Sequence, residues 1–288
     1  MSVFKFNNHV RGPQRDAKYY AMKERLEEHY NEACQYFAHD NIVGLFCQGS
    51  QNYGLDIPGS DLDTKLIVTP TFQDLAFNKK PVSTTHVRAN NEHIDFKDIR
   101  LYVETFRKQN LNFLEILFTH YYIWSSQYAD QWDRLINARE DIAHMNPYRA
   151  VKSMEGIAKE KYHAFEHPYP SKVDVLAKHG YDPKQLHHLC RVEDYLRRYI
   201  KGESYEKCLQ PKDPQFLIDI KLGKFSYEKA IQMKDKSMAN IEEMAKKFYD
   251  KNAPKEDEKT LELLRDVQYH IMRISVKEEL HPYVLSNL

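Results

Sequence analysis

The chain has 288 residues, of which 42% are hydrophobic and 29% charged, the ordinary range for a globular protein. Its 42 lysine and arginine residues balance 42 aspartate and glutamate residues, which excludes a global attraction to nucleic acid or membranes. The four cysteines are scattered, which predicts reduced thiols. The sequence does not start with the apolar run of a signal peptide, and it has no stretch of roughly 18 to 20 apolar residues, so no membrane span is predicted. We therefore expect a cytoplasmic protein without a membrane partner.

The first half of the chain mixes helical and strand patterns. In chain order, it predicts a helix over residues 15–39, strands over 42–47 and 60–68, a third strand within 84–100, and helices from residue 98 onward. The clearest part of the third strand is His93–Lys97. Beyond about residue 137 the sequence shows no strand pattern.

The second half of the chain is predicted to be helical. Helical patterns cover residues 148–166, 183–201, 226–248 and 256–279, and connectors are predicted over 203–225 and 251–258. The helix over 183–201 has the clearest ends, with Asp182 as N-cap, Pro183 at the first position and Gly202 after the last turn. The sequence thus predicts an α+β fold, with a mixed domain over residues 1–140 and a helical domain over residues 141–288.

A run of turn residues and carboxylates connects the first two predicted strands. Gly49 and Ser50 follow a buried strand directly, which suits a tight turn whose N–H groups and hydroxyl face phosphate oxygens. Asp61 and Asp63 lie two apart on the next strand, so both carboxylates point to one side while Leu62 points into the core. Neighbouring carboxylates repel unless a cation lies between them, so the pair predicts a Mg²⁺ or Mn²⁺ site. An isolated Asp-x-Asp would favour a surface turn, but the preceding Gly-Ser turn favours a site that binds a metal ion and phosphate.

The pattern Gly-Ser-x-x-Tyr-Gly-Leu followed by Ser-Asp-x-Asp resembles the signature of the DNA polymerase β-like nucleotidyltransferase superfamily. It is similar in particular to the branch of uncharacterised bacterial and phage predicted nucleotidyltransferases. The similarity extends to residues 110–119 and 181–191, so it covers most of residues 20–245. It implies a nucleotidyltransferase fold in the first half and a two-metal transfer of a nucleoside monophosphate, with ATP the favoured donor, to an acceptor hydroxyl. An RNA 3′ end, a protein hydroxyl and a small molecule all remain possible acceptors.

The resemblance also implies a third carboxylate, on a later strand, that completes the catalytic metal site with Asp61 and Asp63. Asp95 alternates with two apolar neighbours and so points outward, as the two earlier aspartates do. It would contact only the metal that activates the acceptor. Asp98 is better placed as the cap of the following helix, and Glu92 is the remaining candidate.

Four basic side chains are candidates for binding the triphosphate. Lys184, His188 and Arg191 fall at i, i+4 and i+7, on one face of a predicted helix. The simpler interpretation is a solvated face, whereas the resemblance implies that they neutralise the triphosphate from across a cleft that the helical domain closes. Lys65, on the same strand face as the aspartates, either reaches a phosphate or is an ordinary surface charge.

Two further interpretations stay open at this stage. A catalytically inactive nucleotidyltransferase fold could serve as a binding or regulatory module, although both aspartates and the Gly-Ser turn are retained. A nucleic-acid-binding helical protein with the first half as scaffold is disfavoured by the neutral charge and the absence of a basic run. The sequence leaves the acceptor, the base of the nucleotide and the oligomeric state undecided.

Overall fold

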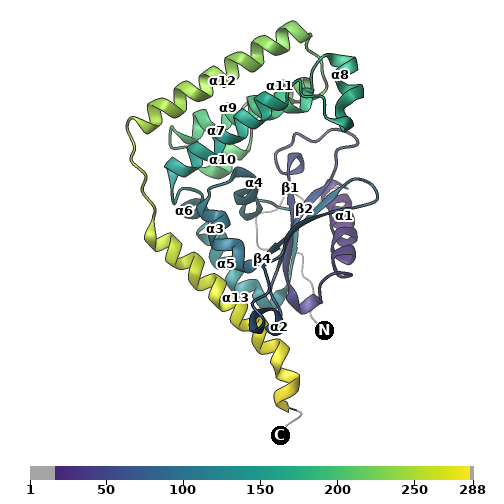
Figure 1. The fold of residues 1–288 in the computed structure, drawn as a ribbon, viewed down its shortest axis with the longest axis vertical. Helices are drawn as coiled ribbons and strands as arrows, with labels where there is room; N and C mark the ends of the chain where they lie inside the picture. The colour runs from purple at the N-terminus through teal and green to yellow at the C-terminus, as the bar shows by residue number, and fades with distance from the viewer. Residues whose placement is uncertain (1–16, 286–288) are drawn as a thin grey trace.

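The computed structural model describes residues 17–285, with helices and strands mixed in the first half and helices thereafter (Figure 1). The strands are β1 (Ile42–Gln48), β2 (Asp63–Val68), β3 (Ser83–Val87), β4 (His93–Asp98) and β5 (Tyr122–Trp124). The helices among and just after them are α1 (Ala17–Ala33), α2 (Phe72–Ala76), α3 (Tyr102–Arg107), α4 (Leu111–Leu114), α5 (Ala129–Asn137) and α6 (Arg139–Ala143). The later helices are α7 (Pro147–Ala164), α8 (Val173–His179), α9 (Pro183–Tyr199), α10 (Tyr205–Leu209), α11 (Pro214–Lys221), α12 (Tyr227–Tyr249) and α13 (Glu258–Leu285).

Within the described residues the strands form one mixed sheet in the order β3-β4-β2-β1-β5. β1 is antiparallel to β2 and β5, β2 is parallel to β4, and β3 is antiparallel to β4. The register places Gln48 opposite Asp63, and it places Lys65 between Phe46 and Asp95. Because side chains alternate along a strand, these five side chains share one face of the sheet.

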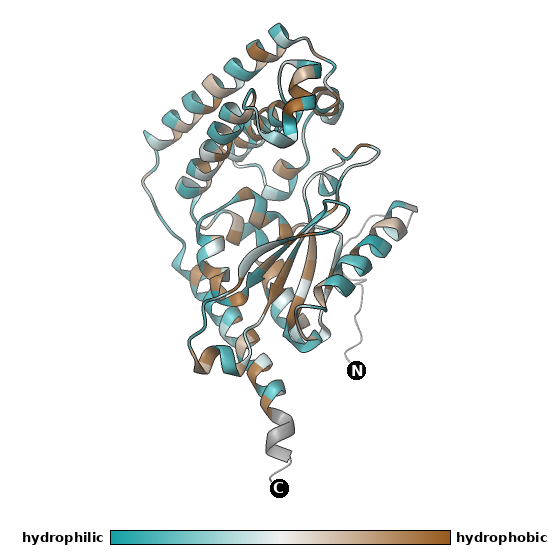
Figure 2. Cartoon of the chain, turned by 45° about the vertical axis from the view of Figure 1, so that its right-hand side comes forward, coloured by the Kyte–Doolittle hydropathy of each residue, from teal (hydrophilic) through white to brown (hydrophobic). Residues whose placement is uncertain are grey.

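Different helices cover the two faces of the sheet, whose apolar strands run through the middle of the molecule (Figure 2). One face packs on α1, through residues such as Leu26, Leu45 and Leu66. On the other face Phe46 stacks on Trp132 of α5, with 4.3 Å between ring centres. The face that carries Asp63 and Asp95 is therefore the one directed towards α5.

The predicted α+β organisation is confirmed, with some differences in the elements. The strand predicted from residue 60 begins only at Asp63, because residues 57–60 form a turn closed by the Ser60 N–H and the Ile57 carbonyl. The third predicted strand is a hairpin of β3 and β4, which turns at Asn91 with φ of 66°. The three-residue strand β5 is too short to give a periodic signal in the sequence, and it was not predicted.

The prediction of a connector over residues 203–225 is wrong, because the segment contains α10 and α11. Its prolines suggest a break in the chain. Pro214, however, occupies the first turn of α11, where a missing N–H costs nothing, and Asp213 caps the helix through the Phe216 N–H. The last residue of α11, Lys221, reaches the segment between β1 and β2, where its Nζ atom donates to the Leu55 carbonyl.

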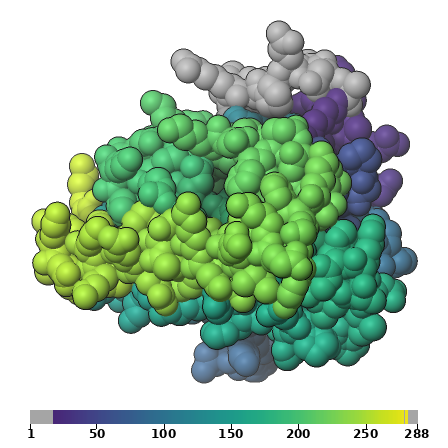
Figure 3. All heavy atoms as spheres, turned by 90° about the horizontal axis from the view of Figure 1, so that it is seen from above, coloured from purple at the N-terminus to yellow at the C-terminus, as the bar shows by residue number. Residues whose placement is uncertain are grey.

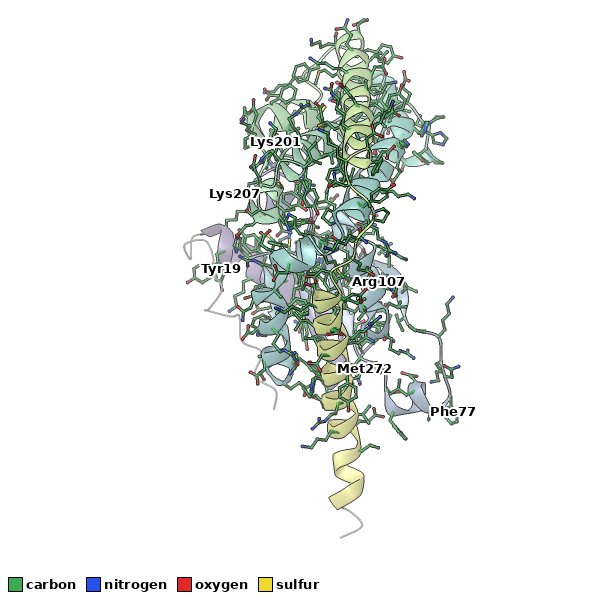
Figure 4. All side chains as sticks on the ribbon, turned by 90° about the vertical axis from the view of Figure 1, so that its left-hand side faces the viewer. Tyr19, Phe77, Arg107, Lys201, Lys207 and Met272 are labelled. Atoms are coloured by element: carbon green, nitrogen blue, oxygen red, sulfur yellow. The ribbon has the colours of Figure 1, made fainter. Side chains whose placement is uncertain are left out.

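The predicted division at residue 140 assigns the last helix to a closing domain, whereas α13 packs against helices of the first half. Figures 1 and 4 show α13 passing back along the first half, with Met272 on the same side of the molecule as Arg107 of α3. The Thr69 and Ser275 hydroxyls are 2.7 Å apart, and Arg107 pairs with Glu256 at 2.7 Å. One apolar cluster runs from β1 to α13, so the two halves share a core.

The remaining later helices form a bundle above the sheet. α9 packs against α7, α11 and α12, and α12 lies across the face seen from above (Figure 3). The bundle holds α9 over the end of β1. Among residues 17–285 no helix is both long and apolar enough to cross a bilayer.

Candidate active site

A cavity of about 340 Å³ lies between the end of β1, the segment before β2, and helices α9 and α11. Its lining includes Gly49, Ser50, Asp61 and Asp63 from the first half, and Lys184, His187, His188 and Lys221 from the second half. Among the predicted site residues, the structure thus brings the Gly-Ser turn, both aspartates, Lys184 and His188 to one cavity. His187 and Lys221 were not predicted.

The Gly-Ser turn is shaped by backbone geometry and by a buried glutamate. Gly49 has φ of 87°, a conformation that favours glycine, and Ser50 begins a short 3₁₀ turn. The Gly49 N–H donates to Glu115 Oε1 at 2.9 Å. The expectation that this N–H faces phosphate is therefore not met in this structure, because a carboxylate from the segment after α4 already accepts it.

The two aspartates reach the cavity in different ways. Asp61 is exposed in the segment that precedes β2, while Asp63 is the first residue of the strand. Asp63 Oδ1 accepts from the His93 backbone N–H at 3.2 Å and lies 3.0 Å from His93 Nδ1. Asp63 is thus fixed against β4, and its second oxygen remains for a ligand.

The donor chemistry at this cavity fits Mg²⁺ or Mn²⁺. Such cations are typically bound by one or two carboxylates together with substrate phosphates and water, and Asp61 and Asp63 supply two carboxylates to one space. Within residues 17–285 no group of three or more His, Cys, Asp or Glu side chains is arranged around a metal position. An ion here would therefore be shared between the two aspartates and the triphosphate.

Asp95 shares the sheet face of Asp63 but does not line the cavity. It accepts from Lys65 Nζ at 3.1 Å, from Thr85 Oγ1 at 2.5 Å and from Gln48 Nε2 at 3.4 Å. Burial tends to raise the pKa of Asp95, but the charge of Lys65 and these hydrogen bonds outweigh it and lower the pKa. Lys65 is buried beside Asp95 and away from the cavity, so the structure does not support it as a phosphate ligand.

The two alternative third carboxylates have other contacts. Asp98 caps the turn that begins at Ile99, by accepting from the Arg100 N–H at 2.8 Å, which confirms its predicted capping role. Glu92 is buried on the opposite face of the sheet, where it contacts Arg25 and His29 of α1. Asp95 is therefore the only one of the three candidates on the face that carries Asp63.

The three basic residues of α9 divide between the cavity and the interior. Lys184 and His188 line the cavity. Burial and the nearby positive groups hold the pKa of His188 well below its usual range, so it is a neutral side chain and not the cation that was expected. Arg191 does not line the cavity: it is 8% exposed, and its guanidinium lies 3.6 Å from the centre of the Tyr53 ring. Arg191, predicted to bind the triphosphate, thus lies neither on a solvated face nor in the lining of this cavity.

Lys221 supplies the cation that sequence reasoning missed. Its Nζ atom lies 3.0 Å from the Leu55 carbonyl, 3.3 Å from Ser60 Oγ and 3.5 Å from Ser50 Oγ. It therefore bridges the Gly-Ser turn and the segment that leads to Asp61. Burial and the charge of Lys184 lower the pKa of Lys221. No local signal marks it, because it ends a short helix inside a proline-rich segment.

Glu115 is the second residue that was missed, although a charge inside the apolar run of residues 111–118 was an available signal. Burial raises the pKa of Glu115 to about 7, against the opposing effects of Arg191 and the Gly49 N–H. Glu115 Oε2 and Arg191 Nη2 have no hydrogen-bond partner among the described residues. The two side chains interact through their charges, which lower the pKa of Glu115 and raise that of Arg191 against the larger effect of burial. Together they lie behind the Gly-Ser turn.

We expect Glu115→Gln to reduce the dependence of stability on pH. The folded chain keeps a proton on Glu115 up to about pH 7, whereas an unfolded glutamate with the ordinary pKa of 4.5 loses it earlier. The free energy of unfolding should therefore fall as pH rises from about 4.5 to about 7, by on the order of 3 kcal/mol from this group. Urea unfolding at pH 5 and pH 7.5 measures the difference. An equal pH dependence in the variant and the wild type would contradict a raised pKa.

Comparison with known proteins adds no assignment. No protein-family model matches the chain, and no curated protein matches it. The class of the protein therefore rests on the motif and on the geometry of this cavity.

Proposed function

We propose that the chain is a Mg²⁺- or Mn²⁺-dependent nucleotidyltransferase that transfers a nucleoside monophosphate from a triphosphate, with ATP favoured, to an acceptor hydroxyl. One observation carries the proposal. A single cavity is lined by Ser50, Asp61 and Asp63 from the first half of the chain and by Lys184 and Lys221 from the second half. Carboxylates for a cation and lysines for phosphate oxygens are the two parts that a metal–triphosphate ligand requires.

Each side chain has a defined part in the proposal. Asp61 and Asp63 hold the divalent cation, which when bound neutralises triphosphate charge and activates the acceptor oxygen. Lys184 and Lys221 bind the outer phosphate oxygens from α9 and α11, and the Ser50 hydroxyl orients the chain of phosphates. Arg191 of α9 stacks on the ring of Tyr53, which ties this helix to the segment that follows the Gly-Ser turn.

Asp95 is proposed as the carboxylate on the acceptor side. Its ion pair with Lys65 lowers its pKa, and it lies on the sheet face of Asp63, outside the lining of the cavity. An ionised carboxylate can accept the proton that the acceptor hydroxyl loses. Lys65 then orients Asp95 and does not bind the triphosphate.

The test is a transfer assay with each α-labelled nucleoside triphosphate, Mg²⁺ or Mn²⁺, and cell extract as the source of acceptor. Label should appear on RNA, protein or a small molecule, and the fraction that carries it identifies the acceptor class. Nucleotide binding without any transfer by the wild type would favour the inactive, regulatory alternative. Absence of both binding and transfer would contradict the proposal.

Lys221→Met should weaken triphosphate binding while the fold persists. Loss of a hydrogen bond to a charged group costs about 1.5 to 3 kcal/mol, so the dissociation constant should rise roughly 10- to 150-fold. Calorimetric titration with a non-hydrolysable ATP analogue and Mg²⁺ measures it. Lys224→Met is the matched control, because Lys224 pairs with Asp219 and does not line the cavity. Equal affinity of both variants would remove Lys221 from the site.

A further inference from the structure

The segment with the two site aspartates is held from behind, on the side where α1 packs. Leu62 and Thr64 alternate with Asp61 and Asp63, and both are 0% exposed. The Leu62 side chain belongs to the apolar cluster between the sheet and α1. The aspartates face the cavity because their neighbours are fixed on the opposite side.

Glu92 is the polar centre of this rear side. Its Oε1 atom accepts from the backbone N–H of Leu62, midway between the two aspartates, at 2.9 Å. The other side chains that donate to its two oxygens are Arg25, His29, Arg88 and Asn90. Donors from α1, from the β3–β4 turn and from the Asp61–Asp63 segment thus converge on one buried carboxylate. Such a satisfied buried group is costly to displace, so it fixes the segments that meet there.

Two of these partners also hold the residues next to the aspartates. His29 Nε2 faces a Glu92 oxygen at 2.9 Å, and His29 Nδ1 faces Thr64 Oγ1 at 2.9 Å. Because a carboxylate only accepts, Nε2 carries the proton and Nδ1 accepts from the threonine hydroxyl. Arg25 donates to the Ser60 carbonyl at 3.4 Å. The chain is therefore anchored before, between and after the two aspartates.

The sheet alone does not supply this anchoring. β2 begins at Asp63, so Asp61 and Leu62 precede the regular ladder. The hydrogen bond from the Leu62 N–H to Glu92 replaces the missing strand contact. Leu62 lies between Asp61 and Asp63, so the orientation of its backbone sets the direction of both carboxylates. Asp61 itself is exposed, and nothing in the ladder fixes its backbone.

We propose that Glu92 is a positioning residue for the cation site: by accepting the Leu62 N–H, it sets the backbone orientation in which Asp61 and Asp63 meet one divalent ion. This inference rests on the proposed function and deepens it. Partners behind direct metal ligands typically change metal affinity by roughly 10- to 100-fold when removed. A merely structural member of the charged cluster would change stability and leave the affinity of the folded protein unchanged.

The experiment compares Glu92→Gln with Glu32→Gln by titrating Mn²⁺ and following its electron paramagnetic resonance signal. Oε2 of Glu92 meets three donors and Oε1 meets two, so the NH₂ group of the glutamine in Glu92→Gln should take the Oε1 position, where the contact to the Leu62 N–H is lost. Glu32 is the matched control, because it accepts from Arg88 at 2.7 Å in the same cluster and contacts His86 with its other oxygen. We expect weakening of Mn²⁺ binding by roughly 10- to 100-fold in Glu92→Gln and by less than about 2-fold in Glu32→Gln.

Circular dichroism confirms folding before each titration. If Glu92→Gln does not fold, Arg25→Met tests the same anchoring, since Arg25 contacts both Glu92 and the Ser60 carbonyl. Unchanged Mn²⁺ affinity in the folded variant, or equal weakening in the Glu32 control, overturns the positioning role while the proposed function stands. A wild-type protein that binds neither Mn²⁺ nor a nucleotide analogue overturns both.

Discussion

Asp61→Asn and Asp63→Asn are each expected to abolish nucleotide transfer. Both carboxylates face one cavity, and a neutral amide cannot replace the charge that holds a divalent cation beside a triphosphate. Removing a residue behind a metal ligand already lowers metal affinity or activity by roughly 10- to 100-fold. Loss of a direct ligand should therefore lower the transfer rate by at least about 1,000-fold, which corresponds to about 4 kcal/mol of activation free energy. The labelled-triphosphate assay at saturating metal measures this loss.

The fold of these variants should persist, which separates a catalytic effect from a structural one. The side-chain amide in Asp63→Asn keeps an oxygen that can accept from the His93 N–H, and Asp61 is exposed. Asp56→Asn is the matched control: Asp56 lies in the same segment and pairs with Lys18 at 2.7 Å, but it does not line the cavity. Transfer near the wild-type rate by either site variant would show that the two aspartates do not hold the catalytic cation.

Arg191→Ala is expected to destabilise the folded chain by about 3 kcal/mol. Arg191 is buried against the Tyr53 ring and provides the positive charge beside buried Glu115. Removing one member of a buried charged pair costs about 3 to 5 kcal/mol, and the lower figure applies because Glu115 can take up a proton instead. Urea unfolding at pH 7.5 measures the change, which distinguishes this buried residue from an arginine on a solvated face.

Lys184→Ala provides the contrasting result from the same helix. Lys184 lines the cavity, so its loss should weaken triphosphate binding by about 1.5 to 3 kcal/mol while the unfolding free energy changes by less than about 0.5 kcal/mol.

In Arg191→Ala combined with Glu115→Gln, part of the lost stability should return, because no unpaired carboxylate remains. If Arg191→Ala leaves stability unchanged, the buried Glu115–Arg191 interaction is not a structural element of the fold.

The sequence by itself determined the local features of the site. Asp63 and Asp95 alternate with buried residues, and the two-residue period of a strand directs both to one face, where the parallel pairing of β2 and β4 places them. Gly49 after a buried strand marked a turn with positive φ, and Asp98 was recognisable as a cap. These features depend on neighbouring residues, so they are readable without knowledge of the rest of the chain.

Only the tertiary structure decided which charges belong to the site. Helical spacing groups Lys184, His188 and Arg191 on one face, but it cannot show that Arg191 packs on Tyr53 while Lys184 reaches the cavity. Lys221 meets Leu55 across 166 positions of sequence. The physical reason is that a side chain's charge state and role depend on the solvent it loses and the groups it meets on folding. The lost solvent and the neighbouring groups both depend on packing between segments that are distant in sequence. The periodicity of one segment contains no information about that packing.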